Sequence, residues 1–258
     1  MVKSIKAACA SFLTFLLLGT AGCGTGQQTA TSQPEEPLPL AQQPGPQGYV
    51  VQDIPGEAVR GRVLLNGQPP APVVSRPWAT GTCGTEIVTY PVRVEKGGIV
   101  DAVVWIDGIG QGKPFDLPEP VLDQQKCVFV PRVLVMQPGE LTVRTQDPTP
   151  HDVHTFAEAN RNFNLSMNQV VNSVALSLRR PEWLRIGCDL HGWMKAYVIV
   201  AAHPYYAVTR DGGTFQLERV PAGRYRLKVW QETLGEMEKE IVVESGKATT
   251  VEFVMQSK

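Results

Sequence analysis

The chain has 258 residues, of which 43% are hydrophobic, and a formal net charge of −1 from 24 basic and 25 acidic side chains. Because the two signs are interspersed, the sequence lacks the basic footprint of nucleic-acid binding, and we expect no nucleic-acid partner. Once its terminal segments are set aside, the length suits one large or two small β domains.

The N-terminus predicts an export signal over residues 1–22. Lys3 and Lys6 precede an apolar stretch too short to span a bilayer comfortably. The stretch ends in "GTAGC", which resembles a bacterial lipobox although Thr20 stands where Leu is usual. The resemblance implies a lipid on Cys23 and a membrane-anchored lipoprotein of the bacterial cell envelope, facing the periplasm or the cell exterior. Ordinary signal cleavage and free secretion is the alternative.

Residues 23–55 are polar and rich in Pro, Gln and Thr, a composition that cannot bury a core and predicts a disordered tether. From residue 57 onward, short β-like runs alternate with Gly, Pro and Asn turns. No helical period longer than a turn or two stands out. We therefore predict an all-β chain, built as a Greek-key sandwich or barrel.

The stretch "IGCDLHGWMKAYVIV", residues 186–200, contains the most informative motif. Cys188, His191 and Met194 lie at three-residue steps in a tight loop, between runs that predict strands. A thiolate, an imidazole and a thioether together favour copper, and two His and one Cys with a weak axial Met form the blue-copper geometry. The plain alternative is a buried Cys, a surface His and a core Met.

A second histidine is needed, and "QDPTPHDVHTF" offers His151 and His154. With Cys188 and His191 they could form a four-ligand zinc site. Two prolines just upstream favour an extended segment, in which residues three apart face opposite ways. We therefore expect one of the two rings to face the Cys loop. The zinc interpretation also leaves Met194 without a role.

The segments "PHDV" and "CDLHGWM" resemble the cupredoxins, small blue copper proteins such as plastocyanin and amicyanin. The upstream stretch "FVPRVLVMQPGELTVRTQD" resembles the strand, turn and following strand of the same family. The resemblance covers about residues 85–202 and is strongest over 127–200. It implies one type 1 copper ion with four ligands, namely His151, Cys188, His191 and, in the axial position, Met194.

One residue departs from the family pattern. Asp152 stands where many cupredoxins have an Asn that braces the copper thiolate by hydrogen bonds. An ionised carboxylate cannot donate such a bond. The pattern therefore leaves open which group braces Cys188.

The cupredoxin resemblance implies electron transfer rather than an enzyme, since four histidines are too few for a typical trinuclear copper cluster. The expected partner is a redox protein such as a c-type cytochrome, bound weakly and transiently. The expected electron route is the ring of His191, with Leu190, Gly192 and Trp193 as an apolar docking patch. The alternatives are a copper chaperone or sensor lipoprotein, or a structural zinc-binding β protein without redox activity.

The remaining cysteines predict a disulfide. With Cys9 in the signal, Cys23 at the lipid site and Cys188 at the metal, Cys83 and Cys127 remain in an oxidising compartment, and we expect them to pair. Two buried thiols are the alternative.

The C-terminal stretch predicts a second β unit. Its turns resemble those of the carboxypeptidase regulatory-like, transthyretin-like β-sandwich, through Asp211, Gly213, Phe215, Pro221, Gly223 and Tyr225. We predict opening strands of this sandwich over 56–84, the copper domain over 85–202 and the sandwich itself over 203–258. The copper domain is either inserted into the sandwich or follows its first strand. No zinc-protease signature is visible, so we expect a structural or adhesive role.

Overall fold

The structure, a computed structural model, describes residues 48–78 and 81–257. The predicted signal, the lipid site at Cys23 and most of the predicted tether lie outside the described residues. The described part of the chain forms strands and one short 3-10 turn (η1, Asp211–Gly213), without an α-helix. This confirms the all-β class. The described residues also contain no helix long and apolar enough to cross a membrane.

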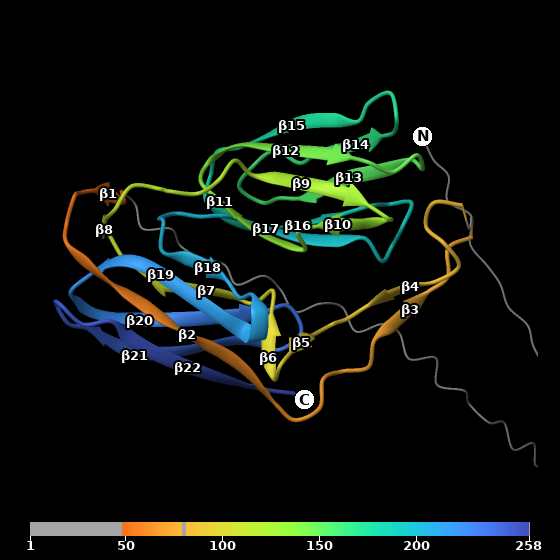
Figure 1. The fold of residues 1–258 in the computed structure, drawn as a ribbon. Helices are drawn as coiled ribbons and strands as arrows, with labels where there is room; N and C mark the ends of the chain where they lie inside the picture. Colours follow the sequence, from red (N-terminus) through yellow and green to blue (C-terminus); the bar gives the residue numbers. More distant parts are fainter. Residues whose placement is uncertain (1–47, 79–80, 258) are drawn as a thin grey trace, which may run out of the picture. The chain divides into compact units, whose positions relative to one another are not determined.

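The first sandwich consists of a four-stranded and a five-stranded sheet (Figure 1). The four-stranded sheet has the order β10-β9-β12-β15, and its strands are β9 (Val121–Gln125), β10 (Val128–Val130), β12 (Gly139–Thr145) and β15 (Ser173–Leu178). The five-stranded sheet has the order β11-β17-β16-β13-β14, and its strands are β11 (Val133–Met136), β13 (His151–Phe156), β14 (Asn164–Met167), β16 (Glu182–Gly187) and β17 (Lys195–Val200).

Alternating side chains explain why these sheets pack face to face. In β12, Leu141, Val143 and Thr145 are buried while their neighbours are partly or fully exposed, which is the period of a strand with one buried face. The inward residues of both sheets form one core, which includes Leu184, Val198 and the two sulfur-bearing residues Cys188 and Met194. The candidate metal loop is therefore packed onto the main core of this sandwich.

The second sandwich also has two sheets, one with the order β18-β7-β20-β21 and one with β19-β2-β6-β5, where β22 pairs with β2. Its strands are β2 (Gly56–Asn66), β5 (Arg93–Glu95), β6 (Gly98–Val100), β7 (Val103–Asp107), β18 (Tyr206–Val208), β19 (Thr214–Pro221), β20 (Gly223–Gln231), β21 (Gly235–Val243) and β22 (Thr249–Gln256). Two short pairs complete the fold, β1 (Val50–Val51) with β8 (Gln111–Gly112) and β3 (Val73–Ser75) with β4 (Ile87–Thr89).

The pairing of β5, β6 and β7 differs from the sequence-based boundary at residue 85. These strands lie within the predicted copper domain but belong to the sheets of the second sandwich. The first sandwich, β9 to β17, is thus an insertion between β7 and β18. A third cluster of buried residues contains Trp105 and Trp230 from the second sandwich and Trp183 from the first, so the two share apolar contacts.

His203 follows β17 and lies in the interior. It is 1% exposed, contacts the rings of Tyr49, Tyr205 and Tyr206, and its Nδ1 accepts the backbone N–H of Tyr205. Burial lowers the pKa of His203 to about 4. This histidine is therefore a neutral structural residue.

The neutral state of His203 predicts a pH dependence of stability. Below the unfolded-state pKa of about 6.5, His203 binds a proton in the unfolded chain but stays neutral in the folded chain. Stability therefore falls as the pH drops from about 6.5 toward 4. The loss attributable to this residue is about 3 kcal/mol at the lower end. Urea unfolding of the native chain and of His203→Asn at pH 7.5 and 4.5 measures it. The variant should lose less stability over this range, and equal losses would contradict the assignment.

Candidate metal centre

The site forms where β13 begins and β16 ends. These two strands pair antiparallel, with His154 opposite Gly187, the last residue of β16. His151 at the start of β13 therefore lies beside the loop that follows β16, which contains Cys188 and His191. The backbone N–H of Asp152 donates to Sγ of Cys188 at 3.2 Å and joins the two segments.

Three buried donor atoms converge at this junction. Nδ1 of His151 and Nδ1 of His191 lie 3.0 Å apart, and Sγ of Cys188 lies 3.6 Å from Nδ1 of His191. The donor atoms of the three residues all lie within 4.8 Å of one another. His151 is fully buried, Cys188 is 5% exposed and His191 is 6% exposed. A thiolate with two imidazoles is a donor set that fits copper or zinc, and Met194 on the same loop makes copper the better fit.

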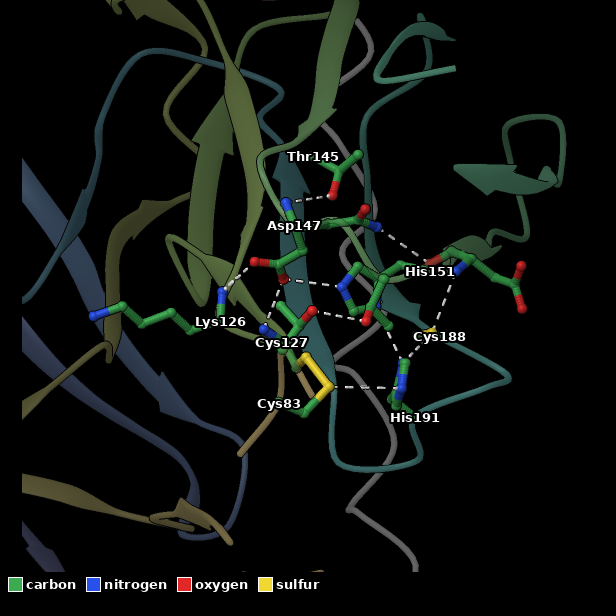
Figure 2. A network of polar contacts seen from close by, with 12 residues as sticks. Cys83, Lys126, Cys127, Thr145, Asp147, His151, Cys188 and His191 are labelled. Atoms are coloured by element: carbon green, nitrogen blue, oxygen red, sulfur yellow. Dashed lines mark hydrogen bonds and ion pairs between the residues drawn. A yellow bond between two sulfur atoms is a disulfide. The ribbon is translucent and has the colours of Figure 1, made fainter. Parts of the chain in front are cut away.

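Asp147 orients the first of these imidazoles. Its buried carboxylate accepts hydrogen bonds from the backbone N–H groups of Lys126 and Cys127, at 2.7 and 2.8 Å. The same group lies 2.9 Å from Nε2 of His151 (Figure 2). An ionised carboxylate only accepts hydrogen bonds, so Nε2 carries the hydrogen and Nδ1 is left with its lone pair facing the other donors. Such an orienting partner is typical of histidines that bind metals.

The surroundings of the three donors act on their protonation. Burial raises the pKa of the Cys188 thiol, and the backbone N–H groups of Asp152, Leu190 and His191 partly offset this by stabilising the thiolate. Burial and the nearby His151 lower the pKa of His191. The site thus favours a neutral His191, which is the form that binds a metal, and it leaves the thiol dependent on a positive ion to lose its proton.

The structure places His154 away from the other donors. Its Nδ1 lies 2.9 Å from the Asp189 carboxylate, and its ring stacks on Phe156. His154 is not within reach of the group formed by His151, Cys188 and His191. The four-ligand zinc site considered from the sequence therefore does not assemble, because residues three apart on a strand face opposite sides.

Two further residues of the predicted site occupy defined positions. Met194 is 1% exposed, and its N–H donates to the carbonyl of His191 at 2.8 Å, which closes the loop. Its role as axial ligand remains a prediction. Asp152 braces the Cys188 sulfur through its backbone N–H, so the main chain supplies a bond that its side chain cannot donate.

The predicted disulfide is confirmed. Cys83 and Cys127 are bonded, with their Cα atoms 5.4 Å apart. The sequence did not predict two features around it. One is the hydrogen bond that the Cys127 N–H donates to the Asp147 carboxylate, and the other is the contact of 3.9 Å between Sγ of Cys83 and Nε2 of His191. No local sequence pattern predicts these two contacts, because each joins segments that are distant in the chain.

The expected docking patch is formed in part. Leu190 is 50% exposed and Gly192 is exposed, whereas Trp193 is half-buried, with its indole N–H donating to the carbonyl of Cys127 at 2.9 Å. The His191 ring, the expected electron route, is buried, and this route remains a prediction.

Comparisons with known proteins give partial matches. The family described as "Polysaccharide lyase family 4, domain II" matches residues 189–251, less than half of the chain. This match names a different family and does not support the predicted carboxypeptidase regulatory-like resemblance. The sheet topology itself shows the second β-sandwich. A search of the curated proteins finds no match.

Solved structures that match part of this chain include cupredoxins. A purple cupredoxin from Nitrosopumilus maritimus is 16% identical, over 32% of this chain and 99% of that one, with a TM-score of 0.28. A reduced mutant form of amicyanin is 20% identical, over 38% and 98% of the two chains, with a TM-score of 0.30. A copper-containing nitrite reductase from Thermus scotoductus is 14% identical, over 54% and 28%, also at 0.30. Scores of this size carry no weight for function, which rests on the donor atoms.

The position of Asp147 predicts its contribution to metal binding. The Asp147 carboxylate accepts from three N–H groups, two of the backbone and one of His151. In Asp147→Asn the side-chain NH2 group faces one of these donors and cannot accept from it, so the His151 ring loses its fixed orientation. We expect a loss of copper affinity of about 10- to 100-fold, measured by competition with a chelator of known affinity.

Glu182→Gln is the matched control. Glu182 is a half-buried carboxylate of the same sandwich that accepts three backbone N–H bonds, from Glu158, Ala159 and Asn160, and pairs with no histidine. It lies at the opposite end of β16 from Gly187. Equal affinity losses in Asp147→Asn and Glu182→Gln would show that a general loss of stability, not His151, explains the effect.

Proposed function

We propose that this chain is a type 1 copper protein that passes single electrons between redox partners. The observation that carries the proposal is the convergence of Nδ1 of His151, Nδ1 of His191 and Sγ of Cys188 within 4.8 Å, all buried. The spacing of these residues matches the cupredoxin motif in the sequence. Copper, when bound, would supply one-electron chemistry, and the residues of this chain would hold it.

The supporting contacts suit a site that does not rearrange. The His151 ring is fixed by Asp147, the Cys188 sulfur by the N–H of Asp152, and the loop by the bond from Met194 to His191. Each contact involves the backbone or a buried group, so the donors cannot easily follow a change of charge at the metal. A small rearrangement is what fast electron transfer requires, whereas an enzyme would need an open position for its substrate.

The exposed part of the ligand loop is the proposed docking point for the partner. Leu190 and Gly192 flank His191 and both face solvent. An apolar spot of this size fits the small and weak interfaces of redox partners, such as a c-type cytochrome. Attachment to a membrane of the bacterial envelope through Cys23 is proposed from the sequence motif alone.

The first test is the visible spectrum of the protein with Cu(II). Thiolate charge transfer gives a blue-copper site its strong visible absorption. We expect this absorption in the native chain, its loss in Cys188→Ser and His151→Ala, and its retention in His154→Ala, whose ring points away from the other donors. Colour that survives in Cys188→Ser would show that the ligand assignment is wrong. Equal effects from both histidine variants would restore the four-ligand model. The rate of electron exchange between the Cu(I) and Cu(II) forms distinguishes the two functions: it should be fast in an electron carrier and slow in a copper chaperone.

The charge of Asp152 predicts a lower reduction potential than an Asn at this position would give. Burial has the largest influence on the pKa of Cys188 and of His191, but the Asp152 carboxylate acts on both to raise it, so its field reaches the donors. A negative charge stabilises Cu(II) over Cu(I). We expect Asp152→Asn to raise the potential by a shift worth about 1 kcal/mol, or roughly 40 mV. Cyclic voltammetry of the two proteins measures the shift, and an unchanged or lowered potential would contradict it.

A further inference from the structure

His191 is covered although it lies on a loop between two strands. Its side chain is almost inaccessible to solvent, and Nε2, the ring nitrogen that does not face the other donors, lies 3.9 Å from Sγ of Cys83 (Figure 2). Cys83 belongs to the loop between β3 and β4, 108 positions earlier in the chain. We call residues 81–84 the cover. A segment from outside the first sandwich therefore packs against the metal site on the His191 side, where the Trp193 ring also lies against His191.

Within the part of the chain that the structure describes, few polar bonds hold the cover in place. The disulfide links Cys83 to Cys127, and the hydroxyl groups of Thr82 and Thr149 lie 2.9 Å apart. Cys127, by contrast, is firmly attached to the first sandwich. Its N–H donates to Asp147, and its carbonyl accepts the indole N–H of Trp193. The disulfide thus joins a weakly held segment to a fixed one.

We propose that the Cys83–Cys127 disulfide holds the cover closed over His191 and thereby controls the access of small molecules to the candidate metal site. This inference rests on the proposed copper function and adds regulation to the same site. A dithiol opens the bond by thiol–disulfide exchange, in which two cysteine thiols form and the dithiol becomes a cyclic disulfide. Among the described residues, the hydrogen bond between the Thr82 and Thr149 hydroxyl groups, worth about 1 kcal/mol, and the contact of Cys83 with His191 then remain.

The reactivity of His191 toward diethyl pyrocarbonate tests the cover without any metal. The metal-free native chain and the double variant Cys83→Ala, Cys127→Ala are treated briefly at neutral pH, and modified histidines are located by mass spectrometry. His154, which is partly exposed in the structure, is the internal reference. We expect the rate at His191 relative to His154 to rise about tenfold or more in the double variant, because the cover can open locally. The native chain reduced by a dithiol should behave likewise, and reoxidation should restore protection.

Leu178→Ala is the matched control for loss of stability. Leu178 is fully buried in the same sandwich and pairs with Gly139, the first residue of β12. Asp147 follows the other end of β12, which is Thr145, so Leu178 lies far from it. Its truncation destabilises the fold while the disulfide stays intact. All proteins are compared at a temperature where circular dichroism shows them folded.

Two results would overturn the proposal. One is an unchanged relative rate at His191 in the double variant, and the other is an equal rise in Leu178→Ala. With Cu(II) bound, the double variant should also release the metal to a chelator faster than the native chain. If the native chain binds no copper but the disulfide still protects His191, the proposed copper function is wrong and the proposal for the cover stands.

Discussion

The carboxylate of Asp147 is the contact on which the arrangement of the candidate site depends. It accepts two backbone N–H bonds from residues 126–127, the turn between β9 and β10, and it orients the His151 ring through Nε2. The turn contains Cys127, whose disulfide reaches the cover and whose carbonyl holds Trp193 of the ligand loop. One buried group thus connects the first histidine, the disulfide and, through them, the loop with Cys188 and His191.

The same connections fix the positions of the donor atoms. Cys188 receives a hydrogen bond from the backbone of β13, and the loop after it closes on the bond between Met194 and His191. The core of the first sandwich packs directly beneath the loop. A close-packed interior resists small shifts, so the donor positions are set by the sheets more than by any one contact.

Sequence patterns predicted the elements that are defined locally. The β-branched runs around the ligand loop form β16 and β17, and strand geometry separates His151 from His154 as expected. The disulfide was predictable because so few cysteines remained without a role. Each of these inferences depends on residue types and spacings within one short stretch, or on counting.

Long-range contacts were not predictable in the same way. A strand pattern shows which residues alternate but not which sheet the strand joins, so β5, β6 and β7 were assigned to the wrong sandwich. A contact on the His191 ring comes from a loop 108 positions away, and the partner of His151 is Asp147, which precedes β13. The strand pairings and the contact on His191 each join two distant segments, and the sequence of neither segment identifies the other as its partner.

In the proposed site, one copper ion is held by the Cys188 sulfur and two imidazoles, with little change between oxidation states. X-ray absorption at the copper edge measures this directly on the loaded protein, oxidised and then reduced. We expect one short copper–sulfur distance and two imidazole nitrogens in both states, with nearly the same distances. A coordination shell of nitrogen and oxygen alone, or a loss of ligands on reduction, would contradict it.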